Sequence, residues 1–545
     1  MKKTKVFALL ATLFVGIFSN LFTPVVSAAD DEKVSITLHK VKDYKNDETD
    51  NEIKNTGDEI LTEDFNFLPG ITFNAYDVTT EYYAAYDASV ATKSVSEAIS
   101  DAVKAVKGEK AGDAPSGKDP VATKETDTYG RATFSLNAKS SGTTTDDTRD
   151  AVYLFVEQAS DGVATIADNL VVSLPIYKQG TNDEVLPEIH LYPKNITKET
   201  PFDKEITSQK NGVKQTDFSI GQIIDYKLKT TIPADIAAEK LVKVEVEGQV
   251  QDQARKLYNF FRFVDTFQSD QLSFINDPKN FSVAVVGGDA LTYDVDYKVE
   301  VDTATVPGTT TVTTALTAVG IDKLANLANK EISFDYQMKI NSLKYIDTEI
   351  KNTAQAIFGN DGTTGIGEWN DKTDPDSETV KTGGYKFVKV DVNNHDKTLA
   401  GAKFVVRAAD APAADAPAAP AEKYLKIDDT TKEISWVGTS GEATEFETLA
   451  DGFVDIKGLE YGTYFLEETK APDGYALPTG NAAYTKFVVG EIPYITISAT
   501  PLKIFNTPKG LLPSTGGAGI ILFVALGAAM VGLAGVYFTS RRKDS

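Results

Sequence analysis

Most of the chain consists of short runs in which apolar and polar residues alternate. From Lys33 onward Val, Ile, Thr, Tyr and Phe recur with a period of two, and clusters of Asp, Asn and Gly separate the runs. Successive side chains of a strand point to opposite faces of a sheet, so this period predicts strands with one buried face. Many short strands separated by polar turns predict an all-β chain made of β-sandwich domains.

One segment, residues 94–108, changes to a helical period. Its apolar residues recur every three or four positions, at Val95, Ile99, Ala102, Val103 and Val106. Ser94 and Glu97 have the spacing of a capping box, and Gly108 can end the helix. We expect one helix inserted in the first sandwich, followed by a polar loop to about Asp127. A packed helix is favoured over a binding surface.

Both ends of the chain carry long apolar runs. Three lysines before residue 6, an apolar run over 6–18 and small residues at 27–29 predict a secretory signal peptide over 1–29. At the other end, the apolar run 518–538 is long enough to cross a bilayer, and the basic residues Arg541, Arg542 and Lys543 follow it. Taken alone, that pattern is typical of a plain membrane anchor.

The remaining ectodomain has roughly 480 residues, which at about 100 to 200 residues per domain predicts three domains. Residues 361–383 are rich in Gly, Asp, Thr and Lys without periodicity, which favours a linker. The Ala- and Pro-rich stretch 408–421 is expected to be a solvated loop. The predicted segments are the signal peptide 1–29, the first domain 30–195, the second domain 196–360, the linker 361–383, the third domain 384–508 and the C-terminal segment 509–545.

Composition excludes several functions. The chain has no cysteine, although a signal peptide leads to a compartment that permits disulfides, so any covalent crosslink must use other chemistry. The net charge of −24 argues against binding to nucleic acid. His39, His190 and His395 lie far apart in the sequence without ligand spacing, so we expect surface or strand histidines, no metal site, no cofactor and no catalytic triad.

In each expected sandwich a lysine, a carboxylic acid and an asparagine share a strand face with apolar residues. The three trios are Lys40, Glu157 and Asn195 in the first domain, Lys204, Asp265 and Asn352 in the second, and Lys389, Glu468 and Asn506 in the third. In the first domain the alternation turns Asn195 inward and its neighbour Lys194 outward.

Such a trio can react. Burial disfavours the charged form of the lysine and pushes the acid toward its protonated form. The neutral amine can attack the asparagine side-chain carbonyl while the acid moves protons and ammonia leaves, forming an isopeptide crosslink. The alternative for each domain is a buried salt bridge between lysine and acid, with a satisfied asparagine nearby.

The pentapeptide Leu512, Pro513, Ser514, Thr515 and Gly516 directly precedes the C-terminal apolar run. It resembles a Gram-positive cell-wall sorting signal. The resemblance implies that a sortase cysteine attacks the carbonyl of Thr515, releases Gly516 onward and passes the acyl group to an amine. The apolar tail is then a processing segment outside the fold.

Residues 464–475, which include Glu468, resemble the pilin E-box and match it at every fixed position. With Lys389 and Asn506, the third domain resembles a CnaB-type sandwich. The first domain is also similar to the CnaB type, although 153–160 lacks the second half of the box. The second domain resembles a CnaA-type domain, for which the ending Asn352, Thr353 and Ala354 is typical. The resemblance implies immunoglobulin-like sandwiches in which Glu157, Asp265 and Glu468 promote crosslinking.

Tyr192, Pro193 and Lys194 resemble the end of the pilin motif of sortase-assembled pilus backbone subunits. The match is partial, because Val185 stands where the family has tryptophan and Ile189 and Leu191 replace valines. The resemblance implies that Lys194 is the sortase acceptor.

The resemblances together imply the backbone subunit of a Gram-positive pilus: secreted, anchored in the cell wall, supporting adhesion, and a structural protein instead of a turnover enzyme. Its expected partners are sortases, copies of itself, minor and tip pilins, peptidoglycan and host surface ligands. The main alternative is a monomeric wall-anchored adhesin, which needs no acceptor such as Lys194. A second alternative is a minor or basal pilin, which also needs no acceptor lysine within the fibre. A third is a membrane-bound hydrolase, which would need a nucleophile and base pair that the sequence does not show.

Overall fold

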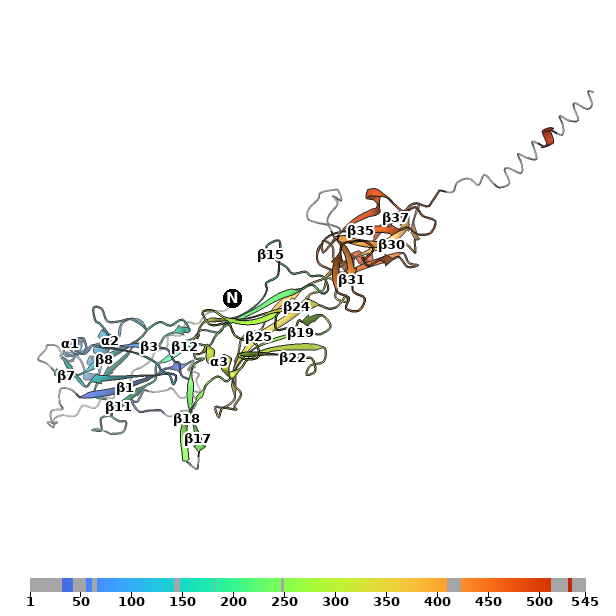
Figure 1. Cartoon of the computed structure of the whole chain (residues 1–545). Coiled ribbons are helices and arrows are strands. Elements are labelled where there is room, and N and C mark those ends of the chain that lie inside the picture. Colours follow the sequence, from blue (N-terminus) through green and yellow to red (C-terminus); the bar gives the residue numbers. More distant parts are fainter. Residues whose placement is uncertain are drawn as a thin grey trace, which may run out of the picture. The chain divides into compact units, whose positions relative to one another are not determined.

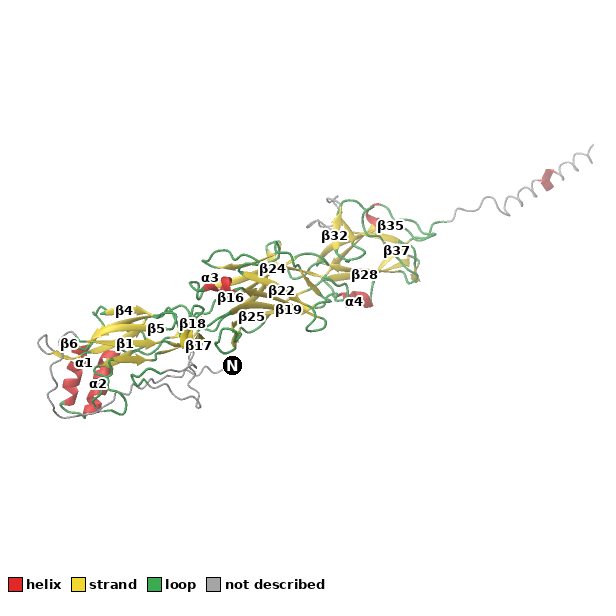
Figure 2. Cartoon of the chain, turned by 60° about the horizontal axis from the view of Figure 1, so that its bottom comes forward, coloured by secondary structure: helices red, strands yellow, loops and turns green. Residues whose placement is uncertain are grey.

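The computed structural model describes residues 32–42, 55–60, 66–141, 148–181, 183–246, 249–408, 423–510 and 528–531. This part of the chain is built mainly of β-strands, which confirms the expected all-β class (Figures 1 and 2). The predicted signal peptide, the sorting pentapeptide and nearly all of the 408–421 loop lie outside the described residues. Among the residues that are described, no helix is long and apolar enough to span a membrane.

The chain forms two compact units. One unit runs to Thr216 and also contains residues 223–339 and 350–380, so it holds the first and second sandwiches. The other contains residues 217–222, residues 340–349 and the chain from Lys381 onward, and holds the third sandwich.

The first sandwich places its first and last strands side by side. Its sheets, in pairing order, are β11 (Glu188–Leu191), β1 (Lys33–His39) and β5 (Arg131–Asn137); β10 (Leu170–Ser173), β8 (Val152–Glu157), β3 (Thr72–Asp77) and β4 (Ala122–Glu125); β2 (Val41–Lys42), β12 (Lys194–Thr197) and β9 (Val163–Thr165); and the hairpin β6 (Lys139–Ser141) with β7 (Thr148–Asp150). β1 runs parallel to β11, with Thr37 opposite His190. β12 runs parallel to β2, with Asn195 opposite Lys42.

Helices cover the outer face of β8, which explains why both of its faces are apolar. The predicted helix is α2 (Val95–Lys107), and Ser94 and Glu97 form the expected capping box. The prediction of a single helix was wrong, because α1 (Thr79–Val90) precedes it (Figure 2). The apolar residues of α1 run consecutively from Tyr82 to Tyr86, so no helical period marks it. α1, α2 and the outer face of β8 form a second core, and the predicted polar loop contains β4.

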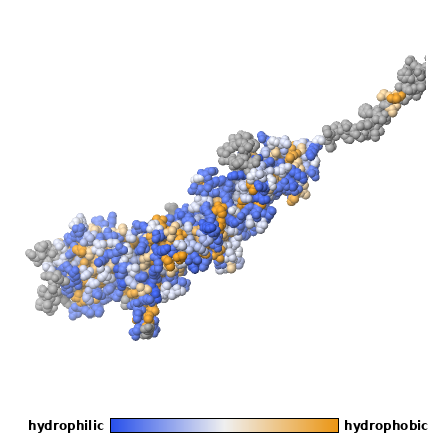
Figure 3. All heavy atoms as spheres, in the orientation of Figure 1, coloured by the Kyte–Doolittle hydropathy of each residue, from blue (hydrophilic) through white to orange (hydrophobic). Residues whose placement is uncertain are grey.

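The second sandwich packs two large sheets. They are β13 (Phe202–Ile206), β16 (Ile224–Thr231), β24 (Glu331–Ile340) and β20 (Leu272–Phe274), with β21 (Phe281–Val285) also on β24; and β22 (Tyr297–Asp302), β23 (Thr309–Leu316), β19 (Phe260–Gln268), β25 (Ile350–Asn360) and β26 (Trp369–Lys372), with β27 (Asp376–Val380) also on β25. The smaller elements are the hairpin β14 (Gln209–Lys210) and β15 (Val213–Lys214), the hairpin β17 (Glu239–Val246) and β18 (Gln249–Lys256), and helix α3 (Ala318–Leu324). The β17–β18 hairpin projects from this sandwich (Figure 1) and carries exposed apolar side chains such as Leu241 and Val250 (Figure 3).

The predicted linker 361–383 is wrong. β26 and β27 both lie in it and pair with β25, so that Lys372 is opposite Ile357 and Glu378 is opposite Asn352. The second sandwich therefore extends to Val380. Edge strands are held by backbone hydrogen bonds and need little apolar alternation, which is why the sequence pattern missed them.

The third sandwich also joins its first and last strands. Its sheets are β29 (Asn394–Thr398), β28 (Gly383–Asp391) and β34 (Phe453–Leu459), with β37 (Leu502–Asn506) parallel to β28; and β32 (Ile434–Val437), β31 (Tyr424–Ile427), β30 (Lys403–Ala408), β35 (Gly462–Lys470) and β36 (Tyr484–Val489), with β33 (Phe446–Glu447) on β30. A 3-10 turn, η1 (Gly480–Ala483), and helix α4 (Tyr494–Ala499) complete it. Aromatic and aliphatic residues of both sheets, including Phe387 and Leu466, form its core.

Candidate functional site

The three predicted residues of the first sandwich meet in its interior. Lys40 follows β1, Glu157 ends β8 and Asn195 lies in β12, and all three side chains are buried. Lys40 Nζ donates a hydrogen bond to Glu157 Oε2 at 2.7 Å and another to Asn195 Oδ1. Asn195 Nδ2 donates to Glu157 Oε1 at 2.5 Å. Amine, amide and carboxyl group thus form a closed triangle.

The surroundings of this triangle favour an uncharged lysine. Burial lowers the pKa of Lys40 from 10.5 to about 8, against the opposing charge of Glu157. The Phe73 ring centroid lies 5.7 Å from Lys40 Nζ, and the Ala167 N–H donates to Glu157 Oε2 at 3.1 Å. The neutral amine, which is the nucleophilic form, is therefore accessible near neutral pH.

The third sandwich repeats the triangle. Lys389 Nζ donates to Glu468 Oε2 at 2.7 Å and to Asn506 Oδ1, while Asn506 Nδ2 donates to Glu468 Oε1 at 2.7 Å. Asn506 Nδ2 also lies 3.3 Å from the Ala476 carbonyl oxygen. Burial lowers the pKa of Lys389. The parallel pairing of β28 with β37 brings the lysine to the asparagine although 117 residues separate them.

The second sandwich adds a fourth group to its trio. Lys204 Nζ donates to Asp265 Oδ1 and to the Tyr336 hydroxyl, each at 2.7 Å. Tyr336 donates to Asp265 Oδ2 at 2.6 Å. Asn352 Nδ2 donates to Asp265 Oδ2 at 3.1 Å and lies 3.3 Å from the Tyr336 oxygen. Aspartate and tyrosine therefore join the amine to the amide.

Burial governs the charges at this site. It lowers the pKa of Lys204, and together with the negative charge of Asp265 it raises the pKa of Tyr336 above its ordinary value. Tyr336 therefore keeps its proton and remains a donor to Asp265. The Lys204 amine also lies 5.0 Å from the Tyr226 ring centroid, so aromatic rings enclose it.

Tyr336 is a site residue that the sequence did not reveal. It stands on β24 among the buried residues Phe334, Met338 and Ile340, where an aromatic side chain is ordinary core material. The sequence offers only a general signal: most buried tyrosine hydroxyls have a hydrogen-bond partner, so a tyrosine in a core strand can contact a polar group.

Lys194 is less exposed than predicted. Lys194 is half-buried, and Tyr192, two residues before it, is buried. Residues 55–60 cover this face: the Tyr192 N–H donates to Asn55 Oδ1 at 2.8 Å, and the Ile60 N–H donates to the Tyr192 hydroxyl at 2.6 Å. A segment distant in sequence packs there, which strand alternation cannot reveal. Asn195 does point inward as expected.

The E-box also holds the chain just before the sorting motif. The Lys509 N–H donates to the Gly474 carbonyl at 2.8 Å, and Tyr475 forms a β-bridge with Pro508. Tyr475 in turn donates its hydroxyl proton to Asp391 Oδ2 at 2.7 Å. The end of the box thus fixes the segment that leads to residues 512–516.

Comparison with known families gives three matches along the chain. Residues 31–196 match the Gram-positive pilin subunit D1, N-terminal domain. Residues 506–545 match the LPXTG cell wall anchor motif. These two matches identify the chain as a Gram-positive pilus subunit. Residues 383–500 of this pilin match a prealbumin-like fold domain.

Individual relatives of this pilin are distant. The Fimbrial subunit type 2 of Actinomyces naeslundii is 25% identical over 407 residues, which cover 70% of this chain and 68% of that protein. Among solved structures, the full-length major pilin SpaD from Corynebacterium diphtheriae is 22% identical, with 89% of this chain and 99% of that chain covered and a TM-score of 0.38. The full-length major pilin RrgB from Streptococcus pneumoniae is 17% identical, with 88% and 100% covered and a TM-score of 0.44.

The family matches confirm the expectation of a structural pilus subunit that is anchored at the cell wall of a Gram-positive bacterium. They support a backbone pilin and do not favour the monomeric adhesin.

Proposed function

We propose that a sortase polymerises this pilin by joining the Thr515 carbonyl of one subunit to the Lys194 amine of the next, and that a Lys–Asn isopeptide bond locks each sandwich. The observation that carries the proposal is the adjacency of Lys194 and Asn195 on β12. Asn195 belongs to the buried triangle with Lys40 and Glu157, so a crosslink there would fix the strand that presents the acceptor lysine.

Each trio supplies all the groups that the crosslinking reaction needs. The lysine Nζ attacks the asparagine Cγ, the Cγ–Nδ2 bond breaks, and the nitrogen leaves as ammonia. The acid hydrogen-bonds to both nitrogens on separate oxygens in the first and third sandwiches, so it can accept a proton from the amine and deliver one to the leaving group. Enclosure holds the reactants in one geometry, which supplies the orientation that the reaction lacks in water.

The salt-bridge alternative accounts for the lysine and the acid only. It does not require Lys40 or Lys389 to contact an asparagine oxygen, nor the asparagine to donate to the same acid. Burial also lowers the pKa of each lysine, which makes the nucleophilic neutral amine more accessible than in an ordinary lysine. These contacts support amide exchange in preference to a simple ion pair.

The polymerising step breaks the bond between Thr515 and Gly516 and forms an amide to Lys194. An acyl-enzyme on the sortase cysteine links the two events, and the lysine displaces the cysteine. An ordinary lysine has a pKa of about 10.4, so the sortase must provide a base. The pilin itself performs only its single self-crosslinking reactions. Its partners are sortases, copies of itself, minor and tip pilins, peptidoglycan and host surface ligands.

The test is a blot of cell-wall extracts boiled in detergent, from the native host. Wild-type chains should give a ladder of covalent polymers, and Lys194→Ala should collapse it to a monomer still attached to the wall. Lys198→Ala is the matched control, because Lys198 is an exposed lysine four residues away, and its ladder should persist. A ladder that survives in Lys194→Ala would assign the acceptor to another lysine.

A further inference from the structure

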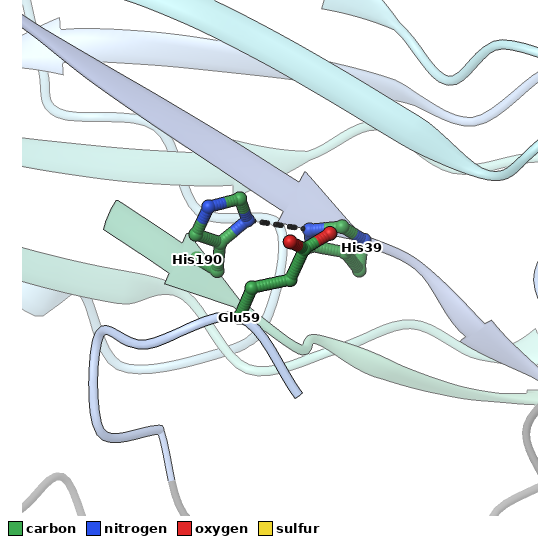
Figure 4. A group of neighbouring side chains, drawn as sticks. All are labelled: His39, Glu59 and His190. Carbon is green, nitrogen blue, oxygen red and sulfur yellow. Dashed lines mark hydrogen bonds between the residues drawn. The ribbon is translucent and has the colours of Figure 1, made fainter. Parts of the chain in front are cut away.

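His39, Glu59 and His190 converge in the first sandwich, although the sequence separates them widely (Figure 4). His39 ends β1 and His190 lies on the adjacent parallel strand β11. His39 Nε2 and His190 Nδ1 are 2.9 Å apart. One ligand atom from each of the three residues lies within 4.8 Å of the other two. Both are strand histidines, as expected, but the fold brings together two residues that lie far apart in the sequence.

We propose that His39 Nε2, His190 Nδ1 and a carboxylate oxygen of Glu59 bind one divalent transition-metal ion of the zinc class, with water completing the coordination. Two imidazoles and a carboxylate are a common ligand set for zinc, with bond lengths of about 2.0 to 2.2 Å. The nitrogen and oxygen ligands also suit zinc better than calcium or magnesium, which prefer oxygen ligands alone.

The geometry needs only a small adjustment. Two nitrogens on a tetrahedral zinc ion lie about 3.3 Å apart, so the two imidazoles need to separate by a few tenths of an ångström from their hydrogen-bonded distance. One of the two imidazoles now donates a hydrogen bond to the other. To bind the ion, that imidazole must carry its proton on its other ring nitrogen instead, so metal binding releases no proton from the pair. The Glu59 side chain is exposed and can rotate toward the histidines.

The backbone on both sides of Glu59 is already held in place. The His190 N–H donates to the Gly57 carbonyl at 2.9 Å, and the Ile60 N–H donates to the Tyr192 hydroxyl at 2.6 Å. Tyr192 also stacks on the His39 ring, with the two ring centroids 4.8 Å apart. The site is therefore assembled before any ion arrives, which lowers the ordering cost of binding.

Two charged residues would act on an ion at this site. Arg131, opposite His39 on β5, would repel a cation, but Asp127 lies 3.6 Å from it and offsets part of its charge. Glu59 supplies the negative charge that compensates the ion.

The position of the site indicates what the ion would do. His39 directly precedes Lys40, and His190 lies four residues before Lys194. An ion held by all three ligands would tie residues 55–60 to the ends of β1 and β11, which lead into the crosslinking triangle and the acceptor lysine. We therefore expect the ion to stabilise the first sandwich.

The test uses the full-length chain in mild detergent, stripped with EDTA and titrated with zinc chloride in a calorimeter. Wild type should bind one zinc ion with saturation. Glu59→Gln should weaken binding by at least roughly 10-fold, since even outer-shell changes cost that much, and His190→Ala should abolish it. His395→Ala is the matched control, because His395 lies in the third sandwich, and it should bind like wild type. Zinc should raise the melting temperature of wild type and of His395→Ala only.

Cobalt absorption gives a second readout, because its visible bands report nitrogen coordination and should be lost in His190→Ala. Millimolar calcium should not displace the cobalt. The proposal would be overturned if wild type showed no saturable zinc binding. It would also be overturned if wild type, Glu59→Gln and His190→Ala bound zinc equally, or if calcium displaced the cobalt. Glu59→Gln alters an exposed side chain, so misfolding cannot explain its loss of binding. None of these measurements depends on polymerisation.

Discussion

The Tyr336 hydroxyl donates to Asp265 Oδ2 at 2.6 Å, on the carboxylate oxygen opposite to the one that accepts Lys204. Lys204 also donates to the same hydroxyl at 2.7 Å. The tyrosine therefore lies between the amine and the acid of the second sandwich and can hold both in position. The first and third triangles do without such a group, because in them the lysine contacts the asparagine directly.

Tyr336→Phe should slow or prevent crosslinking in the second sandwich, because it removes the hydroxyl that orients Lys204 and Asp265. Intact mass should show a fraction of chains that retain one ammonia. Tyr226→Phe is the matched control: Tyr226 stacks on Tyr336, and within the described residues its buried hydroxyl has no hydrogen-bond partner. In this control the intact mass should still fall short of the variant's own sequence mass by the full ammonia loss, and removal of an unpaired hydroxyl should leave the stability unchanged or improve it. Complete ammonia loss in Tyr336→Phe would limit the tyrosine to a packing role.

The folded chain made without any sortase should contain up to three isopeptide bonds, because each trio is assembled within a single sandwich. Its intact mass should fall below the sequence mass by one ammonia per bond. Peptide mapping should join Lys40 to Asn195, Lys204 to Asn352 and Lys389 to Asn506. A mass equal to the sequence mass would mean that the three lysines are salt-bridged.

Glu468→Ala should restore one ammonia and lower the melting temperature of the third sandwich. The bond closes a loop of more than a hundred residues, so by analogy with a disulfide its loss should cost roughly 3 to 5 kcal/mol. Glu447→Ala is the control, because Glu447 is an exposed carboxylate of the same sandwich, and it should change neither quantity. Calorimetry and intact mass measure the two effects together. Loss of stability without the added ammonia would show that Glu468 supports folding only.

Asn195→Ala should expose the titration of Lys40, because the crosslink can no longer form. The folded pKa of about 8 lies below the ordinary 10.5, so between these values the unfolded state binds more protons. The free energy of unfolding of the first sandwich should therefore rise as pH increases from about 8 to 10.5, by about 3 kcal/mol at most. Denaturant unfolding at several pH values measures it. Wild type, with Lys40 acylated, should lack this rise, and a fall in the variant would indicate a stable ion pair.

The strand positions of the trios followed from the sequence alone. A lysine, an acid or an asparagine among alternating apolar residues must share their buried face, since side-chain direction in a strand has a period of two. That rule placed Lys40, Lys204 and Lys389 inside, and it placed Glu468 and Asn506 with them. The C-terminal anchor motif was likewise predicted from a short linear pattern, and residues 506–545 match the LPXTG cell wall anchor motif. The signal peptide over 1–29 stays a prediction.

Tertiary structure decided what lies on the other side of each strand. Alternation gives the direction of a side chain but not the segment that packs against it. The sequence therefore could not predict three contacts: residues 55–60 over Tyr192, the helices over β8, and Tyr336 at the second trio. The edge strands β26 and β27 are held by backbone hydrogen bonds, which leave little trace in side-chain pattern. The His39–His190 pair depends on the parallel register of β1 and β11, strands about 150 residues apart. Only the folded chain fixes that register, because it results from burying both strands in one core.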